Sequence, residues 1–567
     1  MIALIAVLVS TAATLAIGAY GVRIARTTSD FFVASRAVPP MWNASAISGE
    51  YLSAASFLGV AGLIMKYGLS MLWYPVGFAA GYVTLLILVA APLRRFGAYT
   101  IPDFAEGRLD SPRLRRLATM FVLLIGWFYL LPQMRGAGLT LHVVLGLPRW
   151  VGVVLVGTVI TANIALGGMK GITFVQAFQY WLKVTAISLP AFFLLAHAVG
   201  GRSPTASQLP SFAKATTIEL ESKTRFVVAE STTVDVVAGK LDSSGVVGRR
   251  ELQPGEHRAS AGTTLAFDNG ALVPHISGMQ ALDGARWSVP NGGVHRGNAH
   301  PLFATYSLII ATFLGTMGLP HILVRFYTNP DGRAARKTTL IVLLLLGAFY
   351  VFPPVYGVLG RVFAPELYLT GQTDSVVLVL PHAVVGGLAG DVLGALVAAG
   401  AFAAFLSTAS GLLISVAGSV AYDLLGGSIR EFRYSAVGTG LVSIVLGLLV
   451  VGVEINVLVG WAFAIAASTF CPLLVLGIWW RGLTSSGAAA GMIAGGGLAS
   501  LGIVLSRTSV GVGGWPSALL TNPAAWSVPL AFTTMIVVSR LTSGRVPRDV
   551  NAKMLALHLP ESLRASA

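Results

Sequence analysis

The stretch ISGEYLSAASFLG, from Ile47 to Gly59, lies inside a run of sequence that is otherwise apolar enough to cross a membrane. It contains two glycines, three serines and one ionisable residue, Glu50. A carboxylate is costly in hydrocarbon, and glycine weakens a helix. Their occurrence together predicts that the membrane helix is interrupted at Gly49-Glu50 and that the interruption serves a function.

The composition of the whole chain is that of a polytopic membrane protein. Of its 567 residues, 55% are hydrophobic and 11% are charged, whereas soluble domains have about 25% charged residues. The net charge of +15 could suggest nucleic acid. The basic residues lie mainly in alternate connections, however, which is typical of loops on the cytoplasmic face of a membrane. We therefore expect a lipid bilayer and no nucleic acid as partner.

Apolar runs long enough to cross a bilayer predict an all-α membrane protein with about 13 transmembrane helices. They lie near residues 2–21, 41–65, 71–93, 117–145, 150–166, 173–199, 302–324, 338–360, 385–420, 433–453, 456–480, 485–505 and 523–540. The first run lacks a basic n-region and a cleavage site, so we expect it to be a retained span. The alternation of basic connections predicts a multi-pass protein of the cytoplasmic membrane with its N-terminus outside and its C-terminus in the cytoplasm.

The predicted spans divide the chain into five parts. Spans 1–6 occupy residues 1–200, spans 7–11 residues 301–480, spans 12 and 13 residues 481–540, and a cytoplasmic tail residues 541–567. Between the first two groups lies a polar insertion, residues 201–300, with strand-like alternation and the turn sequences FDNGALV and VPNGG. We expect it to be extracellular, as a small β-rich domain or a partly disordered flap without a role in transport.

Several functional classes are excluded or disfavoured by what the sequence lacks. It has no Walker loop, no HExxH zinc helix and no CxxC pair, and its single cysteine, Cys471, cannot form an internal disulfide. Uphill transport would therefore draw on an ion gradient. No set of nucleophile, base and metal ligands in the spans suggests an enzyme. The short sequence after Arg540 favours a transporter over a solute sensor.

A second interrupted span is predicted in YSLIIATFLGTMGLPHILVRFY, where Gly315, Gly318 and Pro320 fall in mid-span. Five spans separate the starts of the two interrupted spans. This spacing predicts two inverted five-helix repeats, spans 2–6 and 7–11, with spans 2 and 7 discontinuous. Free carbonyls at such an interruption carry partial negative charge and suit a small hard cation.

Further oxygen ligands are available in the ninth span, GAFAAFLSTASGLLIS. Ala404, Ser407 and Thr408 stand at i, i+3 and i+4, so one carbonyl and two hydroxyls share a helix face. The alternative is that the hydroxyls only bond to carbonyls of their own helix.

Four segments resemble the sodium:solute symporter family. They are TSDFFVASRAVPP (Thr28–Pro40), GGMKGITFVQAFQY (Gly167–Tyr180), GTMGLPHILVRFYT (Gly315–Thr328) and AFAAFLSTASGLLISVAGSVAYDL (Ala401–Leu424). The last two are similar to the family's acetate and short-chain monocarboxylate branch. The resemblance covers the chain except residues 201–300 and the tail. It implies symport of acetate, propionate or pyruvate with Na⁺, and no cofactor. The alternatives are another small solute (proline, a sugar, a vitamin or urea) and H⁺ as coupling ion.

The resemblance also implies a sodium site between spans 2 and 9. Its ligands would be the backbone oxygens of Gly49, Leu52 and Ala404 and the hydroxyls of Ser407 and Thr408. Many members of the branch have aspartate where this chain has Glu50. We expect Glu50 to tune the cation site, or to pair with a partner such as Arg135, rather than to bind the ion.

The solute site implied by the resemblance lies between spans 2, 4, 7 and 11. Its candidate residues are Thr312 and Thr316 in span 7 and Gln133 and Arg135 in span 4, because a carboxylate requires hydrogen-bond donors or cations. An arginine within a span is a functional candidate by default. The competing interpretation is that Arg135 neutralises Glu50 or reaches a membrane face.

Three further features of spans 7 and 11 have open interpretations. His321 is either a proton shuttle or a packed, hydrogen-bonded histidine. Arg325 is interpreted as a basic anchor at the cytoplasmic end of its span. The small residues from Trp461 to Thr469 either line a pocket for a small solute or allow close helix packing.

Overall fold

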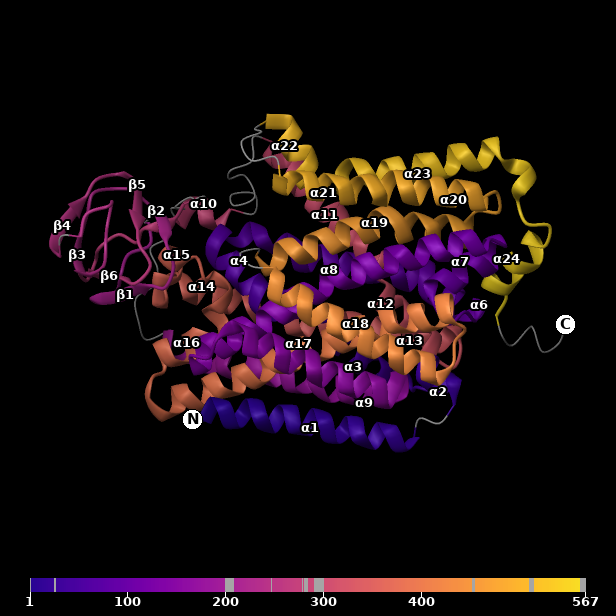
Figure 1. The fold of residues 1–567 in the computed structure, drawn as a ribbon, viewed down its shortest axis with the longest axis horizontal. Coiled ribbons are helices and arrows are strands. Elements are labelled where there is room, and N and C mark those ends of the chain that lie inside the picture. The colour runs from indigo at the N-terminus through magenta and orange to yellow at the C-terminus, as the bar shows by residue number, and fades with distance from the viewer. Residues whose placement is uncertain are drawn as a thin grey trace.

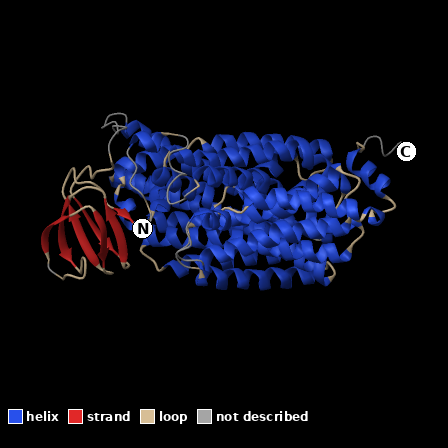
Figure 2. Cartoon of the chain, turned by 90° about the horizontal axis from the view of Figure 1, so that it is seen from above, coloured by secondary structure: helices blue, strands red, loops and turns tan. Residues whose placement is uncertain are grey.

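The computed structural model of the chain is a bundle of long helices that lie side by side, with a small β-sheet unit at one end (Figures 1 and 2). The structure describes residues 2–24, 27–198, 209–245, 247–277, 279, 284–289, 300–450, 454–508 and 514–560. Most of the predicted turn VPNGG and residues 561–567 of the predicted tail lie outside the described residues.

Within the described residues, eleven helical segments are long and apolar enough to cross a membrane, and one bent pair of helices makes a possible twelfth. The segments are formed by α1 (Ile2–Ile24), α5 (Trp73–Thr84) with α6 (Ala90–Phe96), α8 (Pro112–Leu145), α9 (Arg149–Ala198), α11 (Pro301–Gly318) with α12 (Pro320–Val324), α13 (Gly332–Tyr350) with α14 (Pro353–Phe363), α17 (Gly387–Ser419), α18 (Ile429–Leu449), α19 (Ile455–Trp479), α20 (Ser485–Met492) with α21 (Leu498–Thr508), and α23 (Ala524–Leu541). The bent pair is α3 (Pro40–Tyr51) and α4 (Val60–Tyr67), joined through the π turn η2 (Ala55–Gly59) at an angle of 67°.

Short helices lie between these spans or, in one case, after the last of them. They are α2 (Thr28–Val33), α7 (Ile101–Leu109), α10 (Gly284–Ser288), α15 (Glu366–Thr370), α16 (Val376–Val384), α22 (Gly514–Thr521) and α24 (Val550–His558). The remaining turns of 3-10 or π helix are η1 (Ala34–Arg36), η3 (Leu69–Leu72), η4 (Leu85–Val89), η5 (Arg325–Thr328), η6 (Thr373–Ser375), η7 (Val420–Leu425), η8 (Ile493–Gly497) and η9 (Ser543–Arg545).

Helix α9 covers the predicted fifth and sixth spans in one element of 50 residues. At about 1.5 Å per residue it would be roughly 75 Å long if straight, more than twice the bilayer core. Its backbone leaves the helical region at Gly168 (φ 56°, ψ −161°), where two helices meet. A Cβ at Gly168 would lie 2.6 Å from the Phe31 ring, so this position requires glycine for its conformation and for its packing. The total of thirteen spans stays a prediction.

The two predicted interruptions are present, but the first is displaced along the chain. Helix α3 continues through Gly49 and Glu50 and ends at Tyr51, so the interruption lies at Leu52–Ser53. Gly49 has a different purpose: a Cβ there would overlap the carbonyl oxygen of Gln176 in α9, so glycine permits close packing. The second interruption is at Leu319, whose extended backbone separates α11 from α12.

Seven strands form in the described part of the predicted insertion. They are β1 (Thr216–Leu220), β2 (Thr224–Val228), β3 (Thr232–Ala238), β4 (Gly248–Leu252), β5 (Gly255–Ala259), β6 (Thr263–Phe267) and β7 (His275–Ile276). They make two antiparallel sheets, in the orders β1-β6-β3-β4 and β5-β2-β7. Apolar side chains such as Phe226, Val236 and Leu265 alternate inward and form the core of this unit. The unit projects from the end of the bundle at which α1 begins, and α24 (Val550–His558) lies at the other end (Figure 1).

Helices α9 and α17 pack against each other at the centre of the bundle, and α1, α3 and α8 pack around them. Helix α17 is apolar on all faces, as expected for a helix enclosed by others. Every residue of α17 from Val397 to Ser419 is buried. The interruption of α3 therefore faces α9 and α17 away from lipid.

Candidate ion and solute site

The interruption of α3 leaves backbone carbonyls without partners in their own helix, because the last four carbonyls of a helix have no N–H group ahead of them. Helix α17 supplies two donors. The hydroxyl of Ser407 donates to the oxygen of Gly49 at 2.7 Å, and the hydroxyl of Thr408 donates to the oxygen of Glu50 at 2.5 Å. These bonds hold the end of α3 against α17.

A third helix contributes a lysine to the same point. Lys183 of α9 is fully buried, and its Nζ donates to the oxygens of Gly49 and Leu52, the latter at 2.8 Å, and to the hydroxyl of Ser407 at 2.6 Å. The oxygen of Ala404 accepts a hydrogen bond of 3.1 Å from Ser407. The predicted ligand atoms are thus brought together, and the Lys183 Nζ atom lies among three of them.

The sequence prediction omitted Lys183. The residue could have been found, because it is a lone lysine inside the apolar run 173–199, and an ionisable residue within a span is a functional candidate. Its distance from Gly49 in the sequence gives no indication that the two meet.

Glu50 pairs with Arg325, and two predictions are corrected by this contact. The Oε2 atom of Glu50 lies 2.7 Å from Nε of Arg325, and both side chains are fully buried. Arg325 also donates to the hydroxyl of Thr173 at 2.8 Å and to the amide oxygen of Gln176. The interpretation of Arg325 as a basic anchor is therefore wrong: the short η5 turn carries it into the bundle, where it neutralises a carboxylate.

The suggested pairing of Glu50 with Arg135 is wrong for the same reason. Arg135 is half-buried on α8, and its electrostatic partners are Asp374 and Glu454. A glycine makes room for the longer glutamate side chain at the interruption, since a Cβ at Gly411 of α17 would overlap the Glu50 carboxylate.

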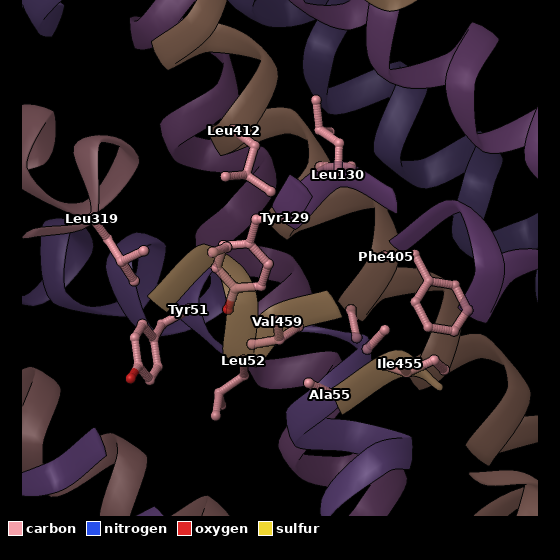
Figure 3. Close-up of a cluster of buried hydrophobic side chains, with 14 of the residues drawn as sticks. Tyr51, Leu52, Ala55, Tyr129, Leu130, Leu319, Phe405, Leu412, Ile455 and Val459 are labelled. Carbon is pink, nitrogen blue, oxygen red and sulfur yellow. The ribbon is translucent and has the colours of Figure 1, made fainter. Parts of the chain in front are cut away.

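Gln133 completes the interruption from the other side. Its amide oxygen accepts a hydrogen bond of 2.9 Å from the N–H group of Ala54, one of the unpaired donors at the start of the second half-helix. Tyr129, one turn earlier on α8, places its ring in the same cluster of buried side chains as Tyr51 and Leu52 (Figure 3).

The two threonines of span 7 have different surroundings. The hydroxyl of Thr316 donates to the oxygen of Thr312 at 2.7 Å and lies 3.0 Å from the hydroxyl of Tyr51, so it lies where the two interrupted spans meet. The hydroxyl of Thr312 donates to carbonyls of its own helix, and it fills the place that a Cβ at Gly77 of α5 would occupy. The structure thus places Thr316 beside the α3 interruption and Thr312 in the contact between α11 and α5.

His321 lies just past the second interruption and is fully buried. Its ring packs edge-on against Tyr129, with centroids 5.2 Å apart. In the described part of the chain neither ring nitrogen has a hydrogen-bond partner, so the interpretation as a hydrogen-bonded histidine is wrong. Two polar nitrogens therefore remain available beside Tyr129.

The small residues of span 11 take part in close helix packing. A Cβ at Gly315 would lie 2.5 Å from the oxygen of Phe463, and a Cβ at Gly318 would overlap the oxygen of Ala466. Phe463 also packs edge-on against Tyr129, with centroids 5.7 Å apart.

This geometry can be compared with known proteins. The family model for the Sodium:solute symporter family matches residues 31–246 and 279–495, which is more than half of the chain. The chain belongs to the sodium:solute symporter family. It is therefore a polytopic membrane transporter, and its relatives are transporters rather than enzymes.

Two relatives from bacteria match this transporter over nearly its whole length. A monocarboxylic acid transporter of Corynebacterium glutamicum is 31% identical over 539 residues, covering 90% of this chain and 86% of the relative. An uncharacterized symporter of Bacillus subtilis, YwcA, is 29% identical over 537 residues, covering 92% and 90%.

Two solved structures share the fold at 14% identity. One is a Na⁺-coupled sialic acid symporter in a substrate-bound outward-open state, with a TM-score of 0.65 over 95% of this chain and 98% of the other. The second is the nucleobase-cation-symport-1 family transporter MHP1 in a closed conformation, with a TM-score of 0.51 over 93% and 98%.

Proposed function

We propose that this transporter imports a short monocarboxylate such as acetate, propionate or pyruvate by cation-coupled symport and alternating access. The observation that carries the proposal is the 31% identity to a monocarboxylic acid transporter across 90% of the chain. Family membership supports Na⁺-coupled symport.

The junction of the two interrupted spans supports a small anionic solute. Thr316, Tyr51 and Tyr129 bring hydroxyl groups to it, and His321 brings ring nitrogens. Such donors suit a carboxylate, and the ring of Phe463 beside Tyr129 suits a short apolar chain. Of the four solute residues predicted from the sequence, we retain Thr316 as a contact. We assign Gln133, Arg135 and Thr312 to the support of the helices.

We also propose that the transporter lies in the cytoplasmic membrane with the β-sheet insertion outside. Arg95 donates to the oxygen of His558, and Lys553 pairs with Asp110, so the basic connection around residues 94–116 shares an end of the bundle with α24. A concentration of basic residues beside the C-terminal helix is expected on the cytoplasmic side.

Uptake of labelled acetate into proteoliposomes tests the solute. We expect excess unlabelled propionate and pyruvate to inhibit uptake, and proline, glucose and urea to leave it unchanged. Inhibition by proline, glucose or urea with no effect of monocarboxylates would assign the chain to another solute.

A matched pair of variants tests the site. Thr316→Val removes the hydroxyl at the junction and should raise the KM for acetate. Thr312→Val makes the same change one turn away and should leave KM unchanged, because that hydroxyl bonds only within α11. Equal effects of the two variants would contradict the assignment.

A further inference from the structure

The polar insertion contacts one half of an interrupted span through Trp287. This residue of α10 is 7% exposed and packs with four apolar residues of α4 and η3: Val60, Leu63, Ile64 and Met71. Helix α10 lies between the strands and the end of the bundle (Figure 1). We infer that Trp287 is a positioning residue, which holds the outer end of α4 and so keeps the junction of the two interrupted spans closed to the outside. The inference goes beyond the proposed function and rests on it for the side of the membrane on which the insertion lies.

The indole of Trp287 pairs with a carbonyl in the last turn of α4. The last four carbonyls of a helix have no N–H group ahead of them, and Met65 is among these residues. Its oxygen accepts hydrogen bonds from Nε1 of Trp287 at 3.0 Å and from the hydroxyl of Tyr368 in α15 at 2.5 Å. The insertion therefore supplies part of the cap of this half-helix.

The chain that follows α4 is shaped for the same contact. Gly68 has a φ of 84°, which favours glycine, and a Cβ there would overlap the backbone oxygen of Trp287. The guanidinium of Arg361 in α14 lies over the indole, 5.4 Å from the centre of the ring. Apolar packing, a hydrogen bond and a cation thus fix the indole at the outer end of α4.

The insertion is also fastened to elements other than α4. His275 of β7 is buried and packs on the ring of Tyr368, with centroids 4.8 Å apart. Glu221, between β1 and β2, pairs with His142 of α8 at 3.0 Å. Because α8 and α15 hold the insertion from two further sides, Trp287 does not depend on α4 for its position, and it can resist a movement of α4.

Helix α4 is the element whose tilt would open the junction. It meets α3 at an angle of 67° across the first interruption, so it can turn there without loss of helical hydrogen bonds. At this interruption Tyr51 and Thr316 are buried, with their hydroxyls 3.0 Å apart. Access to the site of a transporter with discontinuous helices alternates by gating movements around that site. Contacts at the outer end of α4 therefore set how often the junction opens to the outside.

The decisive test measures this opening without any solute. In a Cys471→Ala background, Thr316→Cys places a thiol at the buried junction. A membrane-impermeant maleimide is added to intact cells, and the labelling rate follows the fraction of molecules that are open. Trp287→Ala should raise this rate at least about 10-fold, because both the packing and the hydrogen bond are lost. Trp287→Phe keeps an aromatic ring but no N–H donor, so it should raise the rate by about 2–10-fold. An unchanged rate in Trp287→Ala would overturn the inference.

Two controls separate opening of the junction from loosening of the whole bundle. Trp150→Ala removes a tryptophan that is 58% exposed at the start of α9, and it should leave the rate unchanged. A second reporter, Ser527→Cys, places the thiol at an equally buried position of α23. It should stay unlabelled in Trp287→Ala, since the ion pair of 2.5 Å between Lys66 and Glu454 still holds α4 to α19. Equal acceleration at both reporter positions would overturn the inference.

Uptake measurements keep this inference apart from the proposed function. Trp287→Ala should lower the KM for external acetate, because apparent affinity rises with the fraction of molecules in the binding-competent state. A protein that is only destabilised would lose maximal rate at an unchanged KM. An unchanged or raised KM would therefore overturn the inference. Failure of the wild type to take up acetate, with the expected labelling pattern intact, would overturn only the proposed solute.

Discussion

The ion pair between Glu50 and Arg325 should be the costliest contact in the bundle to break from one side. Both side chains are fully buried, and their closest atoms are 2.7 Å apart. Removing one partner of a buried pair costs about 3–5 kcal/mol, because the other charge stays buried without compensation. Arg325→Met leaves the Glu50 carboxylate without its partner. Glu50→Gln leaves Arg325 with Thr173 and Gln176 as acceptors, so it should be the milder change.

The double variant makes this argument quantitative. Independent effects would sum to about 3–5 kcal/mol for Arg325→Met plus the smaller cost of Glu50→Gln. We expect the double variant to cost no more than Arg325→Met alone, since no uncompensated charge remains. The expected coupling is at least about 2–3 kcal/mol, the upper part of the range for residues in contact.

Maleimide labelling of Cys471 during heating measures these effects in the full chain, because that thiol is buried until the bundle unfolds. For a chain of this length we expect about 1–2 °C per kcal/mol, so that Arg325→Met should lower the melting temperature by about 3–10 °C. The partly exposed pair Lys553–Asp110 is the control, and Lys553→Met with Asp110→Asn should shift it by less than about 1 °C. If the melting-temperature shifts of Glu50→Gln and Arg325→Met add in the double variant, the view that the two side chains compensate each other's charge is refuted.

Three further predictions follow from contacts around the site and in the insertion. Gly411→Ala should lower the melting temperature and Glu50→Asp should partly restore it, because the added methyl group overlaps the longer carboxylate; no restoration in the double variant would contradict the overlap. Gly49→Ala should cost about 1–3 kcal/mol and reduce uptake, since it forces α3 away from Gln176, whereas Gly460→Ala faces open space and should have neither effect. In the insertion, burial alone would raise the pKa of Asp242 and lower the pKa of His257. The hydrogen bond between these two side chains outweighs burial, so the pKa of Asp242 is lowered and the pKa of His257 is raised above 6.5. Asp242 stabilises the fold above its unfolded-state pKa and loses this effect as pH falls through its folded value, while His257 contributes below 6.5 and loses this effect as pH rises through its folded value. Hydrogen-exchange protection of β5 should therefore be greatest between the two pKa values, by at most about 1 kcal/mol because the Asp242 side chain is largely open to solvent, and His257→Ala should remove this maximum.

Much of the fold could be predicted because bilayers impose strong constraints on composition. Apolar length and glycine or proline interruptions predicted the membrane class and both interrupted spans. The position of the first interruption could not be read, since Gly49 serves helix packing and Leu52 carries the non-helical backbone. Local propensity identifies a segment in which a helix is weak, but tertiary contacts determine which residue leaves the helical conformation.

The partners of the buried charges could not be predicted for a related reason. Arg325 follows an interrupted span at the place where a basic anchor is expected, and only the η5 turn carries it inward to Glu50. Arg135 has the stronger sequence signature, a charge in mid-span, yet its electrostatic partners are Asp374 and Glu454 rather than Glu50. A charge pattern along the chain predicts the side of the membrane on which a loop lies, but it does not predict distances between helices.

The same reasoning explains why the oxygen atoms were predictable while Lys183 was not. The spacing of Ala404, Ser407 and Thr408 on one helix face is a property of a single segment, and it can be read locally. What lies between that face and the end of α3 depends on the rotation of a third helix, α9. Sodium and an ammonium group make the same demand on their surroundings, namely several oxygen acceptors close to one point. A ligand set read from sequence therefore predicts which oxygen atoms one face offers, and the side chains of the remaining helices determine what lies among them.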